Sequence, residues 1–242
     1  MSHELTRPAS PLLTGSIDVR EAALSCARRS WYAMRRWCWS SYLHLEVEGV
    51  GHVARRGGVL LCANHTSHLD APAILAALPR DLALRTSTAA ARDVFGDHGW
   101  RDALSRVVTN AMPVERGAGF SRGLRELEAV LHDRRPLILF PEGRRPTDGR
   151  LAEFKPGAAM LALRTGAPIV PIHIAGADRS LPRGGHFPRP HDVRVRFGNP
   201  IDPAPYRQAL RAGRLSKRQA YDQVTATLRS DITALATAVA AA

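Results

Sequence analysis

The 242-residue sequence has no run of about 18 apolar residues, the length that a helix needs to cross a bilayer. A membrane-spanning helix is therefore not expected. The first residues also lack the apolar core of a signal peptide, because charged residues and early prolines interrupt them. The sequence predicts a chain that can lie on a membrane without crossing it.

Cysteine is scarce as well. The three cysteines are Cys26, Cys38 and Cys62. Their odd number, wide spacing and apolar or aromatic surroundings predict reduced, buried thiols in the cytosol rather than a disulfide framework. Zinc-finger spacing and an aromatic RNA-binding signature are also missing, so nucleic acid is not an expected partner.

Acidic residues are few relative to basic ones. Lys and Arg together number 34 against 22 Asp and Glu, which gives a net charge of +12. Such a balance favours an anionic partner, for which anionic lipid headgroups and phosphorylated small molecules qualify. Hydrophobic residues make up 45% of the chain, which excludes a wholly disordered one.

The N-terminal part differs from the rest of the chain. Residues 1–17 contain several breakers and predict a flexible lead, whereas residues 18–42 contain none and predict a helix. One apolar stripe follows steps of three and four: Leu24, Ala27, Trp31, Met34, Cys38 and Tyr42. Arginines beside tryptophans suit a membrane interface, so we expect an amphipathic interfacial helix within residues 1–42. A helix that packs on the domain with its arginines in water is the alternative.

Residues 43–242 alternate between strand-like and helix-like segments. Strands are expected at 45–50, 59–63, 82–87, 111–114, 137–140, 169–174 and 193–197. Helices are expected at 69–78, 89–108, 120–132, 157–165 and 216–241. This order predicts one α/β domain with a mostly parallel sheet flanked by helices.

The most informative segment is residues 64–70, which read Asn-His-Thr-Ser-His-Leu-Asp. They follow a predicted strand and enter a predicted helix, at the sheet edge where α/β proteins bind ligands. His65 could take a proton from a substrate hydroxyl while Asp70 holds the other ring nitrogen protonated. Taken alone, such a pair is more often structural or solvated, so other segments have to decide.

Basic residues follow other predicted strands. Arg116 comes after 111–114, and Glu142, Gly143, Arg144 and Arg145 form the turn after 137–140. Lys155 stands where another helix opens. At one edge of a sheet these cations would form an anion site, in which arginine can clamp a phosphate through two hydrogen bonds.

These segments resemble the glycerophospholipid acyltransferases of the lysophosphatidic acid acyltransferase type, over about residues 45–205. The matching segments are Asn64-His65 with Asp70, Val114-Glu115-Arg116, Phe140-Pro141-Glu142-Gly143, Phe154-Lys155-Pro156-Gly157, Ile169-Val170-Pro171-Ile172 and 194–201. The family's third block usually reads E-G-T-R-S. Here Arg144 and Pro146 replace its two hydroxyl residues, while Arg145 keeps the place of its arginine.

The resemblance implies a glycerol-3-phosphate acyltransferase-like fold and an O-acyltransferase. His65 and Asp70 would be catalytic, whereas Arg116, Glu142, Gly143, Arg145 and Lys155 would form the substrate phosphate site. The acceptor would be a lysophospholipid, most simply 1-acylglycerol 3-phosphate, and the donor acyl-CoA or acyl-acyl carrier protein. Neither a cofactor nor a metal is expected, and the enzyme would work peripherally at the cytoplasmic face of a membrane.

Three alternatives stay open on the residues, and a metal site is a fourth that the spacing does not favour. Another lysolipid or glycerol 3-phosphate could be the acceptor. Residues 119–123 fit G-x-S-x-G, so Ser121 could be the nucleophile of a lipase or esterase, although no apolar strand runs directly into it. His65, His68 and Asp70 do not match a standard zinc block. Finally, the chain could be a non-catalytic module that binds anionic lipid.

Overall fold

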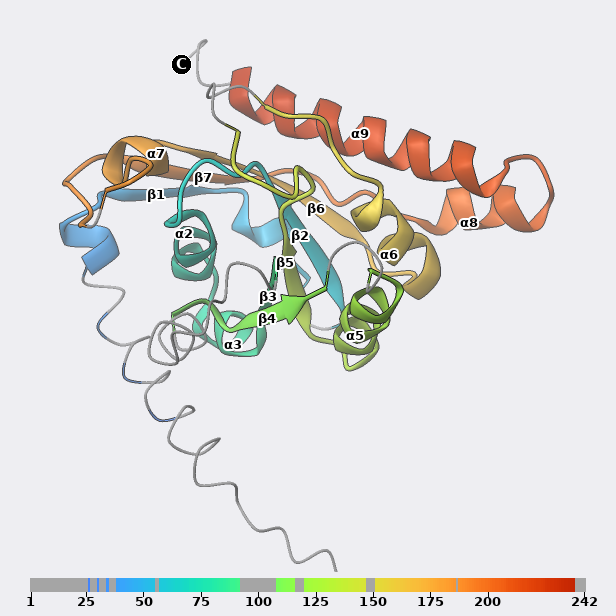
Figure 1. The fold of residues 1–242 in the computed structure, drawn as a ribbon, viewed down its shortest axis with the longest axis horizontal. Coiled ribbons are helices and arrows are strands. Elements are labelled where there is room, and N and C mark those ends of the chain that lie inside the picture. The colour runs from blue at the N-terminus through green and yellow to red at the C-terminus, as the bar shows by residue number, and fades with distance from the viewer. Residues whose placement is uncertain are drawn as a thin grey trace, which may run out of the picture.

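Figure 1 shows the fold, which is that of a computed structural model. The structure describes residues 26, 30, 34, 38–54, 57–91, 108–115, 120–146, 151–185 and 187–237.

The described residues form one seven-stranded sheet, with the strand order β1-β7-β6-β2-β5-β3-β4. The strands are β1 (Leu45–Glu48), β2 (Val59–Ala63), β3 (Ser87–Ala91), β4 (Ala111–Val114), β5 (Pro136–Leu139), β6 (Ile169–Ala175) and β7 (Val193–Phe197). All neighbours pair in parallel except β6 and β7, which are antiparallel. The predicted, mostly parallel sheet is thereby confirmed.

β2 lies at the centre of the sheet, and this position explains why its sequence is uniformly apolar. All five of its residues, Val59–Ala63, are buried. Alternate side chains point to opposite faces of a strand, so Leu61 joins one apolar core while Leu60 and Cys62 join the other. A parallel strand covered on both faces needs apolar residues at every position rather than at every second one.

Helices cover both faces of the sheet (Figure 1). Helices α2 (Asp70–Ala77) and α3 (Arg80–Arg85) supply side chains to one core. Helices α5 (Phe120–His132), α6 (Gly157–Thr165) and α9 (Lys217–Thr237) supply the other. The remaining elements are η1 (Val50–His52), α7 (Ala177–Ser180) and α8 (Ala204–Arg211).

One strand prediction is wrong. Residues 82–87 were expected to form a strand, but α3 occupies 80–85 and the strand β3 begins only at Ser87. Leu82 and Ala83 are buried while Asp81 and Arg85 are exposed, so the short apolar run is the buried side of one helical turn. Periodicity alone cannot separate the two in so short a run.

The expected helix over 89–108 is wrong at its start. Residues Thr88–Ala91 pair with β4, and Ser87 and Thr88 pair with β5, so sheet pairing overrides the helix propensity of the alanines. The rest of that prediction, over 92–107, lies outside the described residues. The expected strand over 45–50 ends at Glu48, and Val50 opens a 3-10 turn.

The predicted N-terminal helix falls mostly outside the described residues. Cys26, Ser30, Met34 and 38–41 are helical, as expected. The interfacial role of residues 1–42 and the boundary at residue 43 stay predictions. Within the described part of the chain, no helix is both long and apolar enough to span a membrane.

Candidate active site

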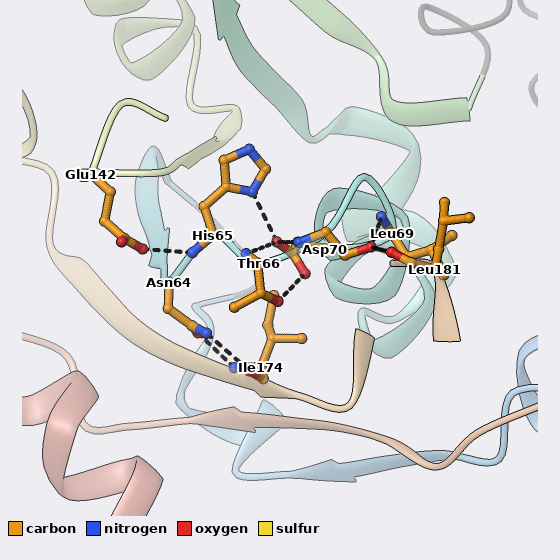
Figure 2. A network of polar contacts seen from close by, with 9 residues as sticks. Asn64, His65, Thr66, Leu69, Asp70, Glu142, Ile174 and Leu181 are labelled. Carbon is orange, nitrogen blue, oxygen red and sulfur yellow. Dashed lines mark hydrogen bonds and ion pairs between the residues drawn. The ribbon is translucent and has the colours of Figure 1, made fainter. Parts of the chain in front are cut away.

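The site begins where β2 ends, and Asn64 fixes the direction in which the chain leaves the sheet. Its side chain donates to the carbonyl of Ile174 at 2.9 Å and accepts from the amide of Ile174 at 2.8 Å (Figure 2). The side-chain amide thus replaces a further pair of backbone hydrogen bonds between β2 and β6. Asn64 is buried, so losing either bond would leave unsatisfied polar groups in the core.

Asp70 organises the turn that follows. Its Oδ2 atom accepts hydrogen bonds from the backbone amides of Thr66 at 2.6 Å and Ser67 at 2.8 Å, and lies 2.8 Å from Nδ1 of His65. Its Oδ1 atom accepts from the Thr66 hydroxyl at 3.2 Å. Asp70 is fully buried at the start of α2, where a negative charge is favoured by the helix dipole. Four donors therefore hold this carboxylate in place.

Two further contacts hold His65, one through its ring and one through its backbone. Its ring stacks on Phe140, with the centroids 4.1 Å apart and the planes inclined by 19°. Its backbone amide donates to Oε1 of Glu142 at 2.7 Å (Figure 2). With Nδ1 donating to Asp70, Nε2 is the ring nitrogen left with a lone pair to accept a proton.

Glu142 acts on the backbone of two segments. Its Oε2 atom accepts from the amide of Ala152 at 2.8 Å, while Oε1 holds His65. The side chain is buried, and burial raises the pKa of this carboxyl, partly offset by the two backbone donors. Glu142 therefore ties the turn after β5 to the His65 turn and to the segment before α6.

His65 lines a cavity of about 1010 Å³. One part of its wall is basic: Arg144, Arg145, Lys155 and Arg183. Another part is apolar and is built from β3, β4, β5, α5 and α6: Ala89, Val114, Leu124, Leu127, Leu139, Ala158 and Leu161. The cavity thus offers a proton acceptor, a cationic region and an apolar region to one ligand.

The basic residues are close enough to influence one another. Burial and the charge of Arg183 lower the pKa of Arg145, while the carboxylate of Asp70 opposes this shift. Burial and the charge of Arg145 lower the pKa of His68, which also lines the cavity. Arg145 stays a cation, because guanidinium does not lose its proton in proteins. An anionic ligand would relieve this repulsion.

Gly143 is a glycine for two reasons. Its φ of +71° lies in the left-handed region, and a Cβ there would approach Nζ of Lys155 to 3.0 Å. The turn after β5 therefore passes directly beneath the lysine side chain. The absence of a side chain at Gly143 lets the lysine side chain pass close to this turn.

The structure brings together most of the residues that the sequence nominated. His65, Gly143, Arg145 and Lys155 line the cavity, and Asp70 and Glu142 lie directly behind His65. Arg116 lies outside the described residues, whereas Glu115, which precedes it, lines the cavity. The roles assigned to these residues stay predictions, which the geometry permits.

Sequence reasoning missed Arg183 and the contact that places it. Arg183 follows α7 and stands 28 positions after Lys155, the last basic residue considered, so spacing offered no signal. The Ser67 hydroxyl donates to the carbonyl of Leu181 at 3.0 Å, which ties the segment after α7 to the His65 turn. Phe140 was read only as part of a motif, and its stacking on His65 was not foreseen.

Two alternative sites fit the structure less well. Ser121 is exposed in the first turn of α5 and does not line either described cavity, so it lacks the setting of a nucleophile elbow. In the part of the chain that the structure describes, no three His, Cys, Asp or Glu side chains gather to hold a metal ion.

Comparison with known proteins agrees with this architecture. The model of the Acyltransferase family matches residues 44–175. A 1-acyl-sn-glycerol-3-phosphate acyltransferase of Limnanthes alba is 30% identical over 169 residues, covering 68% of this chain and 57% of that protein. The chloroplastic enzyme BAT2 of Brassica napus, of the same name, is 46% identical over 66 residues, covering 27% of this chain and 19% of that protein.

A solved structure has the same fold. The 1-acyl-sn-glycerophosphate acyltransferase PlsC of Thermotoga maritima superposes with a TM-score of 0.62 at 24% identity, over 93% of this chain and 84% of that one. The sheet, the site and the matched segment define an acyltransferase domain. The chain belongs to the Acyltransferase family. It spans 57% of the length of the Limnanthes alba relative.

Proposed function

We propose that this protein transfers a fatty acyl group from an acyl thioester to the free hydroxyl of a lysophospholipid, most simply 1-acylglycerol 3-phosphate, giving phosphatidic acid. One observation carries the proposal: the imidazole held by Asp70 faces a cavity that is basic in one part and apolar in another. An acylated glycerol phosphate has these same two parts. The names of the matching relatives support this acceptor.

His65 is the general base in this reaction. Nε2 accepts the proton of the acceptor hydroxyl as its oxygen attacks the thioester carbonyl, and the thiolate leaves as the tetrahedral intermediate collapses. Asp70 keeps Nδ1 protonated and stabilises the imidazolium that forms. The acceptor itself attacks, so no covalent acyl-enzyme is needed. The proton on His65 then passes to the departing thiolate.

The basic wall holds the acceptor phosphate. Arg145, Lys155 and Arg183 line the cavity with His65, so they can place the phosphate while the hydroxyl meets Nε2. Positioning of this kind can lower the barrier by several kcal/mol, because two reactants are held in contact. The apolar wall receives an acyl chain. The donor is acyl-CoA or acyl-acyl carrier protein, and no cofactor takes part.

The same proposal assigns a place of action. The acceptor is a membrane lipid, so the enzyme works peripherally at the cytoplasmic face of a membrane. Residues 1–42 would contribute an interfacial helix, and 43–242 the acyltransferase domain. The Trp and Arg pattern of residues 18–42 supports this division. Removing residues 1–42 should reduce sedimentation with anionic vesicles, and unchanged sedimentation would contradict the helix's role.

The test is transfer itself. Purified protein, acyl-CoA and a panel of lysolipids are incubated, and the products are identified by mass spectrometry. His65→Ala should lower kcat about 10² to 10⁴-fold without unfolding the protein, as is typical when a general base is lost. Asp70→Asn should also be severely impaired. Ser121→Ala is the matched control and should keep full activity, whereas a hydrolase would lose it. Full activity of His65→Ala would overturn the mechanism.

A further inference from the structure

The segment between α7 and β7 places one residue in the cavity of His65 and another on the protein surface. Arg183 lines the cavity, whereas Phe187, four positions later, is 84% exposed. Among the described residues the exposed large hydrophobic side chains are Met34, Tyr42, Val47 and Phe187, of which Phe187 is the most exposed. We call residues 181–185 and 187–190 the Phe187 loop.

Hydrogen bonds join the two ends of the Phe187 loop. The amide of Arg189 donates to the carbonyl of Ser180 at 2.7 Å, and the buried Ser180 hydroxyl donates to the carbonyl of Arg189 at 2.9 Å. Near its start, the amide of Gly185 donates to Pro182 at 2.9 Å, and Gly184 takes a φ of +82°. These hydrogen bonds give the loop a defined conformation, and Phe187 is exposed in that conformation.

The loop also contacts the segment that precedes β1. The Tyr42 hydroxyl donates to the carbonyl of Pro188 at 3.2 Å, and Tyr42 is itself 44% exposed. In Figure 1 the loop after α7 and the segment before β1 lie at the same edge of the molecule. The Phe187 loop and the segment that carries Tyr42, which are far apart in sequence, therefore share one surface.

Exposed arginines flank this surface. Arg183 precedes Phe187 in the sequence and Arg189 follows it. Within the described residues, neither arginine forms an ion pair with a carboxylate. The nearby Asp192 is engaged with Nδ1 of His44 at 3.0 Å. Aromatic side chains next to unpaired guanidinium groups suit the headgroup region of an anionic bilayer, where rings enter the boundary and cations meet phosphate.

We propose that the Phe187 loop, together with Tyr42, docks on the surface of an anionic phospholipid bilayer. Phe187 enters the headgroup boundary, and Arg189 contacts lipid phosphates. Arg183 then stands where a lysophospholipid leaves the bilayer for the cavity. This last step rests on the proposed acyl transfer, whereas docking does not. An acidic carrier protein would meet the same arginines, and comparing vesicle binding with activity on acyl-acyl carrier protein distinguishes it from a bilayer.

The test measures binding and catalysis separately, with the full chain. Sedimentation with phosphatidylglycerol-containing vesicles should show that Phe187→Ala lowers the partition coefficient at least tenfold, and Phe187→Asp more. Phe187→Trp should bind as well as the wild type. Arg189→Gln should lower binding to anionic vesicles about fivefold and leave binding to phosphatidylcholine vesicles unchanged. Val47→Ala on β1 and Arg218→Gln on α9 are controls for exposed apolar and basic residues and should bind normally.

The rate of acyl transfer to a lysophospholipid is the second measurement. With a soluble short-chain lysophosphatidate, Phe187→Ala should match the wild type, whereas with a vesicle-embedded acceptor its rate should fall in parallel with binding. Wild-type sedimentation by Phe187→Ala and Phe187→Asp would overturn the proposal. So would a defect seen only with acyl-acyl carrier protein, which would indicate a protein partner. If the wild type transferred nothing to either acceptor, the proposed function would fail while the vesicle result stood.

Discussion

The carboxylate of Glu142 accepts a hydrogen bond from the backbone amide of His65 at 2.7 Å, although 77 positions separate the two residues. The other oxygen of Glu142 accepts from the amide of Ala152. Glu142 therefore holds the main chain of the proposed base, and it is not among the residues that line the cavity of His65. If Lys155 binds the acceptor phosphate as proposed, Glu142 acts on that site indirectly, because the segment that it anchors leads to Lys155.

Replacing Glu142 tests this positioning role. Glutamine offers one acceptor oxygen and one amino group, so Glu142→Gln would place a donor against a backbone donor. We expect kcat to fall roughly 10 to 100-fold, because small displacements of a catalytic group are costly. An unpaired buried amide should also lower the free energy of unfolding by about 1–3 kcal/mol. Steady-state kinetics and urea unfolding measure the two effects.

The control is a carboxylate elsewhere. Glu128 is tied to Arg164 by an ion pair, away from His65, and Glu128→Gln should leave kcat unchanged. Chemical-shift changes at the His65 amide should appear in Glu142→Gln and not in Glu128→Gln. Normal kcat in Glu142→Gln would show that His65 does not depend on this contact.

Prediction from sequence succeeded where the residues of a short segment determine its structure by themselves. β2 was recognisable from five consecutive apolar residues, and the His65–Asp70 pair closes a single turn. It failed at residues 82–91, where α3 and β3 are exchanged relative to expectation, because strand pairing with β4 and β5 decided the outcome. Contacts such as Ser67 with Leu181 depend on the folded sheet and have no local signature.

The basic wall yields a prediction on substrate charge. If Arg145 and Arg183 hold the acceptor phosphate, Arg145→Gln and Arg183→Gln should each raise KM for lysophosphatidate about 10-fold or more, since a charge-assisted hydrogen bond contributes roughly 1.5–3 kcal/mol. The donor's KM should change little. With an uncharged monoacylglycerol as acceptor, the variants and the wild type should be equally slow.

Arg179 provides the matched control for Arg183. It lies four positions earlier, is also exposed, and lines a different hollow of about 560 Å³ rather than the cavity of His65. Arg179→Gln should leave both KM values unchanged. Equal effects of Arg183→Gln on charged and uncharged acceptors would mean that Arg183 shapes the wall without binding phosphate.

The pKa of His68 reports the charge of the same wall. Burial lowers it below the usual 6.5, and the charge of Arg145 adds to the shift. Between the lowered value and 6.5, the unfolded chain binds a proton that the folded chain does not. The contribution of His68 to the free energy of unfolding therefore falls as pH decreases through this window. Arg145→Gln should raise the pKa of His68, as measured by imidazole NMR titration.

Two observations would separate electrostatics from a change of structure. Arg164→Gln removes an arginine paired with Glu128 and should not move the titration of His68. Inorganic phosphate bound at the wall should raise the pKa of His68 in the wild type, because an anion favours the imidazolium. An unchanged titration in Arg145→Gln would place Arg145 too far away to define an anion site.

The apolar wall predicts control of acyl chain length. Ala89 on β3 lines the cavity and is only partly buried, so a larger side chain there can project into the open space instead of disturbing the core. Ala89→Leu should therefore shift the products toward shorter acyl chains while kcat for the shortest is retained. Mass spectrometry of products from an equimolar mixture of acyl-CoA donors measures the shift. Ala129→Leu, on the exposed face of α5, adds the same side chain outside the cavity and should leave the product distribution unchanged. Identical distributions in both variants would mean that the acyl chain binds elsewhere.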